Sequence, residues 1–202
     1  MKKIVLSLFV IIAMTTVQAN AFDLISALKF WDRATSEQSA EVQTAKTLAD
    51  IENQMTTIDK SVQEAFLDVV SQLSTRKEEK TIKSNLKVQT ITDVITGYTN
   101  TLANNKNNFV NTVKSMSTKE KTNLVNSLAT LSENGQQYLL LATDGIKAAT
   151  NALKSTQKLS EFATTVNNVN NVANQLKNRA ATVINLSNQI KAIASSAGVS
   201  VQ

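Results

Sequence analysis

Histidine and cysteine are both absent from the 202 residues of this chain. Histidine-dependent triads, thiolate nucleophiles, the usual zinc sites and haem attachment each need one or the other. The di-iron site of helical bundles also requires histidine. The four glycines are widely separated, so no glycine-rich phosphate-binding loop is present either. Most of the side-chain chemistry that identifies an enzyme is therefore missing.

The remaining candidates for chemistry are a carboxylate pair and a serine–lysine motif. Glu64 and Asp68 are four residues apart and would share a helix face, but charge pairs at this spacing are expected by chance. Ser-x-x-Lys occurs several times, at residues 26–29, 74–77 and 155–158 among others. The Ser-Asp-Asn and Lys-Thr-Gly elements that accompany it in penicillin-recognising enzymes are missing. We predict a protein that is not an enzyme, without catalytic residues, cofactor, metal or small-molecule substrate.

The first 21 residues have the three parts of a secretory signal peptide. Two lysines precede an apolar run from Ile4 to Met14, and Ala19-Asn20-Ala21 supplies small residues for cleavage. The run is shorter than the roughly 20 residues that a membrane-spanning helix needs. We expect a bacterial protein that is cleaved near Ala21 and is then periplasmic or secreted, with an uncleaved N-terminal anchor as the alternative.

The composition of residues 22–202 indicates a single helical domain with a thin core. Exported small domains often rely on disulfides, which this chain cannot form, so packed helices alone must stabilise it. Aromatic residues make up only 4% of the chain. The whole chain has 21 basic and 16 acidic residues; without Lys2 and Lys3 the count is 19 against 16, a charge of +3 that is too small and dispersed to indicate nucleic-acid binding.

The clearest pattern in the chain is a run of apolar or small residues that alternate steps of three and four. This 3.5-residue period predicts one long helix, about residues 138–194, with a single seam to bury against a partner. The seam consists of Tyr138, Leu141, Gly145, Ala148, Ala152, Ser155, Leu159, Phe162, Val166, Val169, Ala173, Leu176, Ala180, Val183, Ser187, Ile190 and Ala194. Its asparagines fall mostly on the outer positions, so we expect them to face solvent.

Other segments predict further helices. Apolar residues from Leu48 to Leu73 recur at helical spacing, which predicts a helix over about 40–73 with a buried stripe. Arg76–Lys80 interrupts the stripe, either as a hairpin tip or as a solvated helical turn. A third periodic segment follows over 82–102, and the asparagine-rich cluster 104–108 predicts a loop.

Two more signals concern helix ends, and one concerns the N-terminal region. Ser117-Thr118-Lys119-Glu120 has the pattern of a capping box, as does Thr35-Ser36-Glu37-Gln38. Asn134-Gly135 is expected to close the helix that begins near Ser117, and Asp144-Gly145 could bend the next one. Phe22–Arg33 is a short amphipathic segment, expected to cap the core or to lie at a membrane interface.

Opposite charges flank the two long apolar stripes. In heptad terms, acidic residues of the helix around 40–73 and basic residues of the helix around 138–194 lie at positions beside the seam, where charge selects a partner. We predict that these helices pack together, with the charges selecting register more than adding stability. The charges are Glu52, Asp59 and Asp68 on one helix and Lys158, Lys177, Arg179 and Lys191 on the other.

These patterns predict an all-α fold, an elongated bundle of long antiparallel helices with coiled-coil-like heptad packing. The function we expect is protein–protein interaction in the envelope, as an assembly factor, chaperone or structural protein, with another protein or a second copy as partner. The alternative is a membrane-active protein of the pore-forming-toxin type. Its suspected segment, Gln137–Ala149, is continuously apolar for only about five residues, far short of a membrane span.

Overall fold

The computed structural model describes residues 40–155 and 159–201, with side chains from 48–147, 151 and 166–201. Every described helix belongs to one compact unit, residues 38–202. The predictions for the signal peptide, its cleavage near Ala21, the Phe22–Arg33 segment, the first capping box and Lys158 lie outside the described residues.

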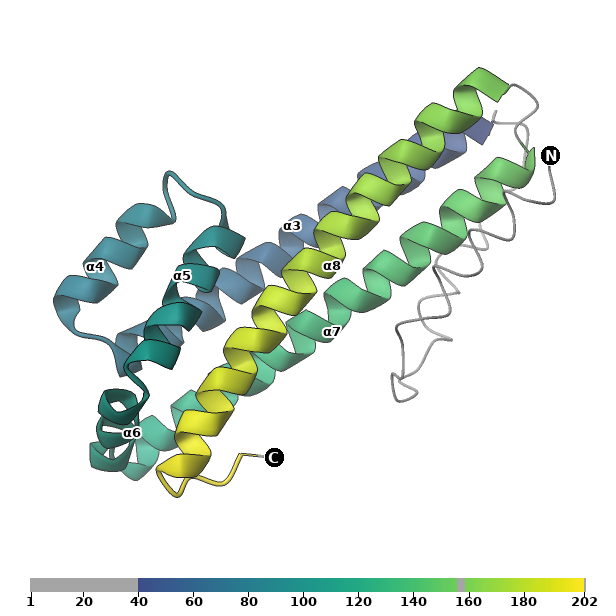
Figure 1. Cartoon of the computed structure of the whole chain (residues 1–202). Coiled ribbons are helices and arrows are strands. Elements are labelled where there is room, and N and C mark those ends of the chain that lie inside the picture. The colour runs from purple at the N-terminus through teal and green to yellow at the C-terminus, as the bar shows by residue number, and fades with distance from the viewer. Residues whose placement is uncertain (1–39, 156–158, 202) are drawn as a thin grey trace. The chain divides into compact units, whose positions relative to one another are not determined.

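Three long helices form the body of this unit: α3 (Ala40–Leu73), α7 (Thr118–Ser155) and α8 (Leu159–Ser196). They lie side by side, and α7 runs antiparallel to the other two (Figure 1). Three short helices, α4 (Arg76–Asn85), α5 (Ile91–Asn104) and α6 (Lys106–Ser115), gather near one end. The described residues contain no strand, so the predicted all-α bundle is confirmed. The heptad detail of its packing stays a prediction.

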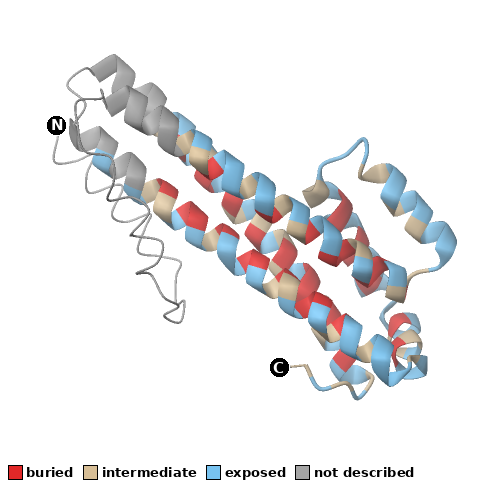
Figure 2. Cartoon of the chain, turned by 180° about the vertical axis from the view of Figure 1, so that it is seen from behind, coloured by how far each residue is buried: buried red, intermediate tan, exposed pale blue. Residues whose placement is uncertain are grey.

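The core lies where the apolar stripes of the long helices meet. On α3, Ile51, Ile58 and Phe66 are buried, as the spacing of that stripe predicts. On α8, every described seam residue from Val169 to Ala194 is buried, while the eight asparagines between positions 167 and 188 are exposed. The buried faces point toward one another in Figure 2. Helical periodicity alone therefore identified which face of each long helix is covered.

The prediction of one helix over about 138–194 is wrong. One helix, α7, ends at Ser155; the next, α8, begins at Leu159 and runs back alongside it (Figure 1). Two antiparallel helices that bury their stripes against each other need the same three-four spacing as one long helix with a single seam. The chain has no proline, and no glycine lies near this reversal to mark it. The period therefore located the buried face but not the turn.

The prediction that Asn134-Gly135 closes a helix is also wrong, because both residues lie inside α7 and are buried. A Cβ atom at Gly135 would lie 2.7 Å from Cγ1 of Ile184 on α8, closer than real carbon atoms approach. Gly135 thus permits close contact between α7 and α8. The helix also continues through Gly145, where a Cβ would lie 3.2 Å from Ile51 Cδ1.

Local capping marks where α4 and α7 begin. The Thr75 hydroxyl accepts from the backbone N–H of Glu78, and the Glu78 carboxylate accepts from the Thr75 N–H, a capping box. Arg76–Lys80 is therefore the first part of α4, not a hairpin tip. The capping box predicted at Ser117 is present, with Glu120 as its partner. The predicted loop at 104–108 is shorter than expected, because α6 already starts at Lys106.

Candidate functional site

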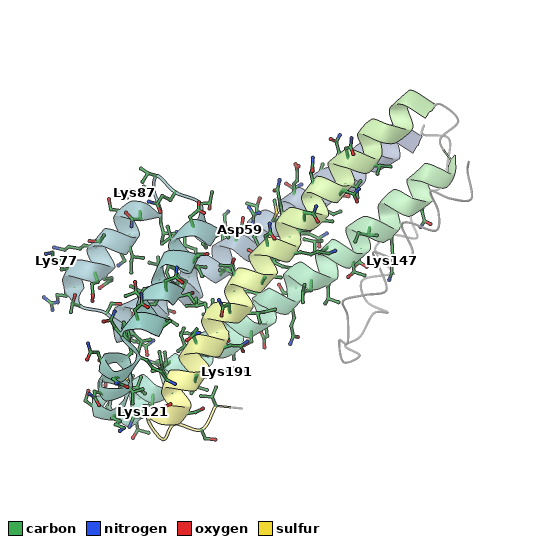
Figure 3. All side chains as sticks on the ribbon, in the orientation of Figure 1. Asp59, Lys77, Lys87, Lys121, Lys147 and Lys191 are labelled. Carbon is green, nitrogen blue, oxygen red and sulfur yellow. The ribbon has the colours of Figure 1, made fainter. Side chains whose placement is uncertain are left out.

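The structure brings together one acidic and one basic residue from the predicted set of pairing charges. Nε of Arg179 on α8 donates to Oδ1 of Asp59 on α3 at 3.1 Å. Glu52 and Asp68 are exposed, and Lys177 and Lys191 are half-buried. Within the described residues, none of these four side chains forms an ion pair. Figure 3 shows Asp59 and Lys191 far apart along the bundle.

A third side chain, Tyr138, also binds Asp59, although the sequence predicted Tyr138 only as an apolar seam residue. The hydroxyl of Tyr138 on α7 donates to the same Oδ1 atom of Asp59. The ring of Tyr138 is fully buried. Burial and then the neighbouring Asp59 raise the pKa of Tyr138 above its usual value, so the hydroxyl remains a donor at neutral pH. One carboxylate oxygen therefore joins α3, α7 and α8.

Two further polar contacts bridge the long helices nearby. Nδ2 of the buried Asn134 donates to Ser61 Oγ on α3 at 2.9 Å. The hydroxyls of Ser132 on α7 and Ser187 on α8 are hydrogen-bonded at 2.8 Å. Such pairs form only in one alignment of the helices, because a shift along the axis would leave buried polar groups without partners. No signal in the sequence distinguished them from other seam or surface residues.

The contact among Asp59, Tyr138 and Arg179, called the polar junction below, leaves no room for a ligand. The small space beside Tyr138 and Arg179, lined also by Val62 and Ile95, is too narrow for a water molecule. Among the described residues, no three acidic side chains are grouped so that they could hold a metal ion. The junction can therefore fix helix register, and it offers no site for substrate or cofactor.

The larger opening is a groove between α4 and α5, with a volume of about 530 Å³. Its apolar part includes Ile82 on α4 and Val94 and Tyr98 on α5, and polar side chains form the rim. The residues lining it are Thr75, Lys77, Glu78, Thr81, Ile82, Asn85, Gln89, Asp93, Val94, Gly97, Tyr98 and Thr101.

The two walls of the groove differ in rigidity. Tyr98 is buried at its base, where its ring lies edge-on to Phe66 and Phe109 at centroid distances of 5.5 and 6.4 Å. Its hydroxyl is hydrogen-bonded to Ser74 at 2.9 Å, and burial raises the pKa of Tyr98 to about 12. By contrast, α4 contributes no buried residue at all. A fixed wall therefore faces a helix with little core contact.

Open space lies directly above Gly97 on the fixed wall. A Cβ atom built there would meet no atom within 4 Å. The periodicity of residues 82–102 predicted one segment there, so this groove was not predicted from the sequence. One signal was available: Ile82 is the only apolar residue among the ten of α4, too few for a helix that is packed into a core.

Comparison of the chain with protein-family models, with curated proteins and with solved structures found no match. The function must therefore be argued from the chain's own residues.

The segment suspected of membrane insertion lies within α7. Tyr138, Leu141 and Ala142 are buried in the core, and Leu140 is 46% exposed. None of the helices in residues 40–155 and 159–201 has the length and apolar character needed to cross a membrane.

Proposed function

We propose that this protein is a non-enzymatic helical-bundle protein of the bacterial envelope that binds another protein through the α4–α5 groove. Export would follow from the signal-peptide pattern and cleavage near Ala21. The single observation that carries the proposal is the groove itself, a rigid apolar wall on α5 facing a weakly anchored α4. The role in the envelope would be assembly, chaperoning or structural support.

The chemistry of the rim favours a protein ligand over a small molecule. Two of its charged side chains, Glu78 and Asp93, already accept hydrogen bonds at the N-termini of α4 and α5. They are therefore not directed at a ligand in the way that the polar groups of a small-molecule site are. Among its apolar side chains, Ile82 is partly exposed, whereas Val94 and Tyr98 are buried at the base. An amphipathic helix that inserts residues at positions i, i+3 and i+7 would suit such a groove.

A pore-forming role is less well supported by the same structure. It would require Tyr138, Leu141 and Ala142 to leave the core in which they are buried. Truncating a large buried apolar side chain lowers the free energy of unfolding by about 2–5 kcal/mol. Moving such side chains out of the core into solvent would therefore be strongly destabilising.

The test is affinity capture from envelope extracts with the exported form of the protein and two variants. Gly97→Leu places a side chain in the open space of the groove, and Ala103→Leu adds the same side chain at an exposed position of α5 outside it. We expect wild type and Ala103→Leu to capture one protein that Gly97→Leu does not. Capture of the same proteins by all three would refute the groove as the binding site.

A further inference from the structure

The segment from α4 to the start of α7 concentrates positive charge. Residues 76–121 contain nine basic and four acidic residues. All four acidic side chains are engaged locally: Glu78, Asp93 and Glu120 in N-terminal caps and Glu79 in an ion pair with Lys83. Within the described residues, the other eight cations of this segment have no acidic partner. Its positive charge is therefore largely uncompensated.

Three cations on α4 and one in the turn after it form a stripe along one side. Arg76, Lys80 and Lys83 on the helix and Lys87 in the turn follow one another at steps of four, three and four, and all are exposed. Each lies two residues from Glu78 or Asn85, which line the groove, and at about 100° per residue this places it on the other side of the helix axis from that residue. In Figures 1 and 3, α4 lies on the outer side of α5, so the stripe faces away from the long helices.

An exposed apolar residue stands at the end of this stripe. Val88, which follows Lys87 in the turn between α4 and α5, is 81% exposed, the highest value among the large apolar side chains of the described residues. A cluster of lysine and arginine side chains is attracted to the surface of an anionic bilayer, and an exposed apolar residue beside it can add contact with the lipid. The cations would contact phosphate groups, and Val88 would enter the boundary below them.

We propose that the outer face of α4, with Val88, is a docking surface for an anionic phospholipid bilayer. Charge complementarity identifies the partner, since the surface is cationic and its own carboxylates are occupied. A nucleic acid fits less well, because the aromatic side chains that the structure describes, Phe66, Tyr98, Phe109 and Tyr138, are all buried and cannot stack on bases. The inference is independent of the groove, which lies on the other face of α4.

The experiment is sedimentation of the whole chain with vesicles of phosphatidylcholine alone and with added phosphatidylglycerol. The test variant is the triple change Arg76→Gln, Lys80→Gln and Lys87→Gln, since glutamine keeps a high helix propensity. The matched control, Lys60→Gln, Lys119→Gln and Lys147→Gln, removes the same charge from exposed positions outside the stripe. Both variants keep the N-terminal apolar run, so a difference between them reports on α4.

We expect binding to the anionic vesicles only, with loss at high salt because screening shortens the reach of surface charge. Each cation near such a surface strengthens binding about fivefold, so the α4 triple variant should bind about 100-fold more weakly than wild type. The control should lose much less. Val88→Ser alone should also weaken binding, and because this substitution changes no charge, the loss would come from the apolar contact.

Three results would overturn the proposal. Equal binding to neutral and anionic vesicles would assign the contact to apolar segments elsewhere. Equal losses in the two triple variants would reduce the effect to net charge. Binding of a soluble polyphosphate that is as strong as vesicle binding, with no effect of Val88→Ser, would identify a soluble polyanion as the partner.

Discussion

The junction of α3, α7 and α8 and the short helix α4 both contain polar side-chain contacts, but only the junction lies against a buried core. In the junction, buried stripes from three helices enclose Asp59, Tyr138 and Arg179, so that one carboxylate oxygen serves two donors. On α4, the capping box is complete and an ion pair is formed, yet no residue is buried. Local interactions therefore suffice to start a helix, whereas its fixed position depends on a covered apolar face.

The largest difference in stability is expected when isoleucine is replaced by alanine in each of the two regions. Ile190 on α8 is fully buried, and Ile82 on α4 is only partly buried. We expect Ile190→Ala to lower the free energy of unfolding by about 2–5 kcal/mol, because it leaves a cavity in the core. Ile82→Ala should cost less than about 1.5 kcal/mol, because little apolar surface is covered there. Urea denaturation measures both, and equal losses would contradict the distinction between the two regions.

Replacing each of two glycines with alanine should change the stability of the protein in opposite directions. Ala at Gly135 would force its Cβ against Ile184, and we expect a loss of about 1–3 kcal/mol despite the better helix propensity. Ala at Gly97 meets no neighbour, so it should stabilise the protein by up to about 1 kcal/mol. Thermal unfolding would report a lower midpoint for the first variant and a higher one for the second. A rise in both would mean that α7 and α8 are not in close contact at Gly135.

The ion pair of the junction should have a moderate effect. Arg179 and Asp59 are partly exposed, with side-chain exposures of 22% and 27%, so screening limits what the charge contributes. We expect Arg179→Glu to lower the free energy of unfolding by about 1–2 kcal/mol and Asp59→Lys in the same chain to restore part of it.

The control for that pair is Lys177→Glu, which reverses a charge two residues away that has no ion pair within the described residues. We expect a change within about 0.5 kcal/mol. If Lys177→Glu costs as much as Arg179→Glu, the overall charge of α8 would matter and the specific contact would not.

The smallest global effect is expected from the cap of α4. Thr75→Ala removes the side chain that accepts from Glu78, which costs about 1 kcal/mol of local helix stability. Because α4 adds no buried residue, the free energy of global unfolding should change by less than about 0.5 kcal/mol. Hydrogen exchange should instead show faster exchange of α4 amides, with those of α5 and α7 unchanged. Parallel loss in all three helices would show that α4 is part of the same cooperative unit.

The sequence predicted the parts of the fold that depend on local chemistry and periodicity. The stripe of α3, the exposed asparagines of α8 and the capping box at Ser117 follow from residue spacing and were confirmed. The reversal between α7 and α8 could not be predicted, because an apolar period continues unchanged through a hairpin of two packed helices. Gly135 was misassigned for a related reason, since close approach to Ile184 is invisible without the partner helix.

The candidate sites show the same limit. The charges flanking the stripes included Asp59 and Arg179, but nothing in the sequence separated them from Lys177, two residues along the helix. Tyr138 was recognised as apolar surface, and its hydroxyl partner depended on the way three helices meet. The groove needs both α4 and α5 in place, and it reflects a shortage of apolar residues on α4 that periodicity does not report.

The three-helix junction also has a consequence for the order of folding. Asp59 and Arg179 are 120 residues apart in the chain, whereas α7 and α8 are neighbours. Short-range contacts form fast and distant ones form slowly, so the α7–α8 hairpin should assemble first and α3 should dock onto it last. During synthesis, α3 is made before α7 and α8, the two helices against which it packs. Its apolar stripe is thus the surface most exposed to aggregation or to capture by a chaperone until α8 is complete.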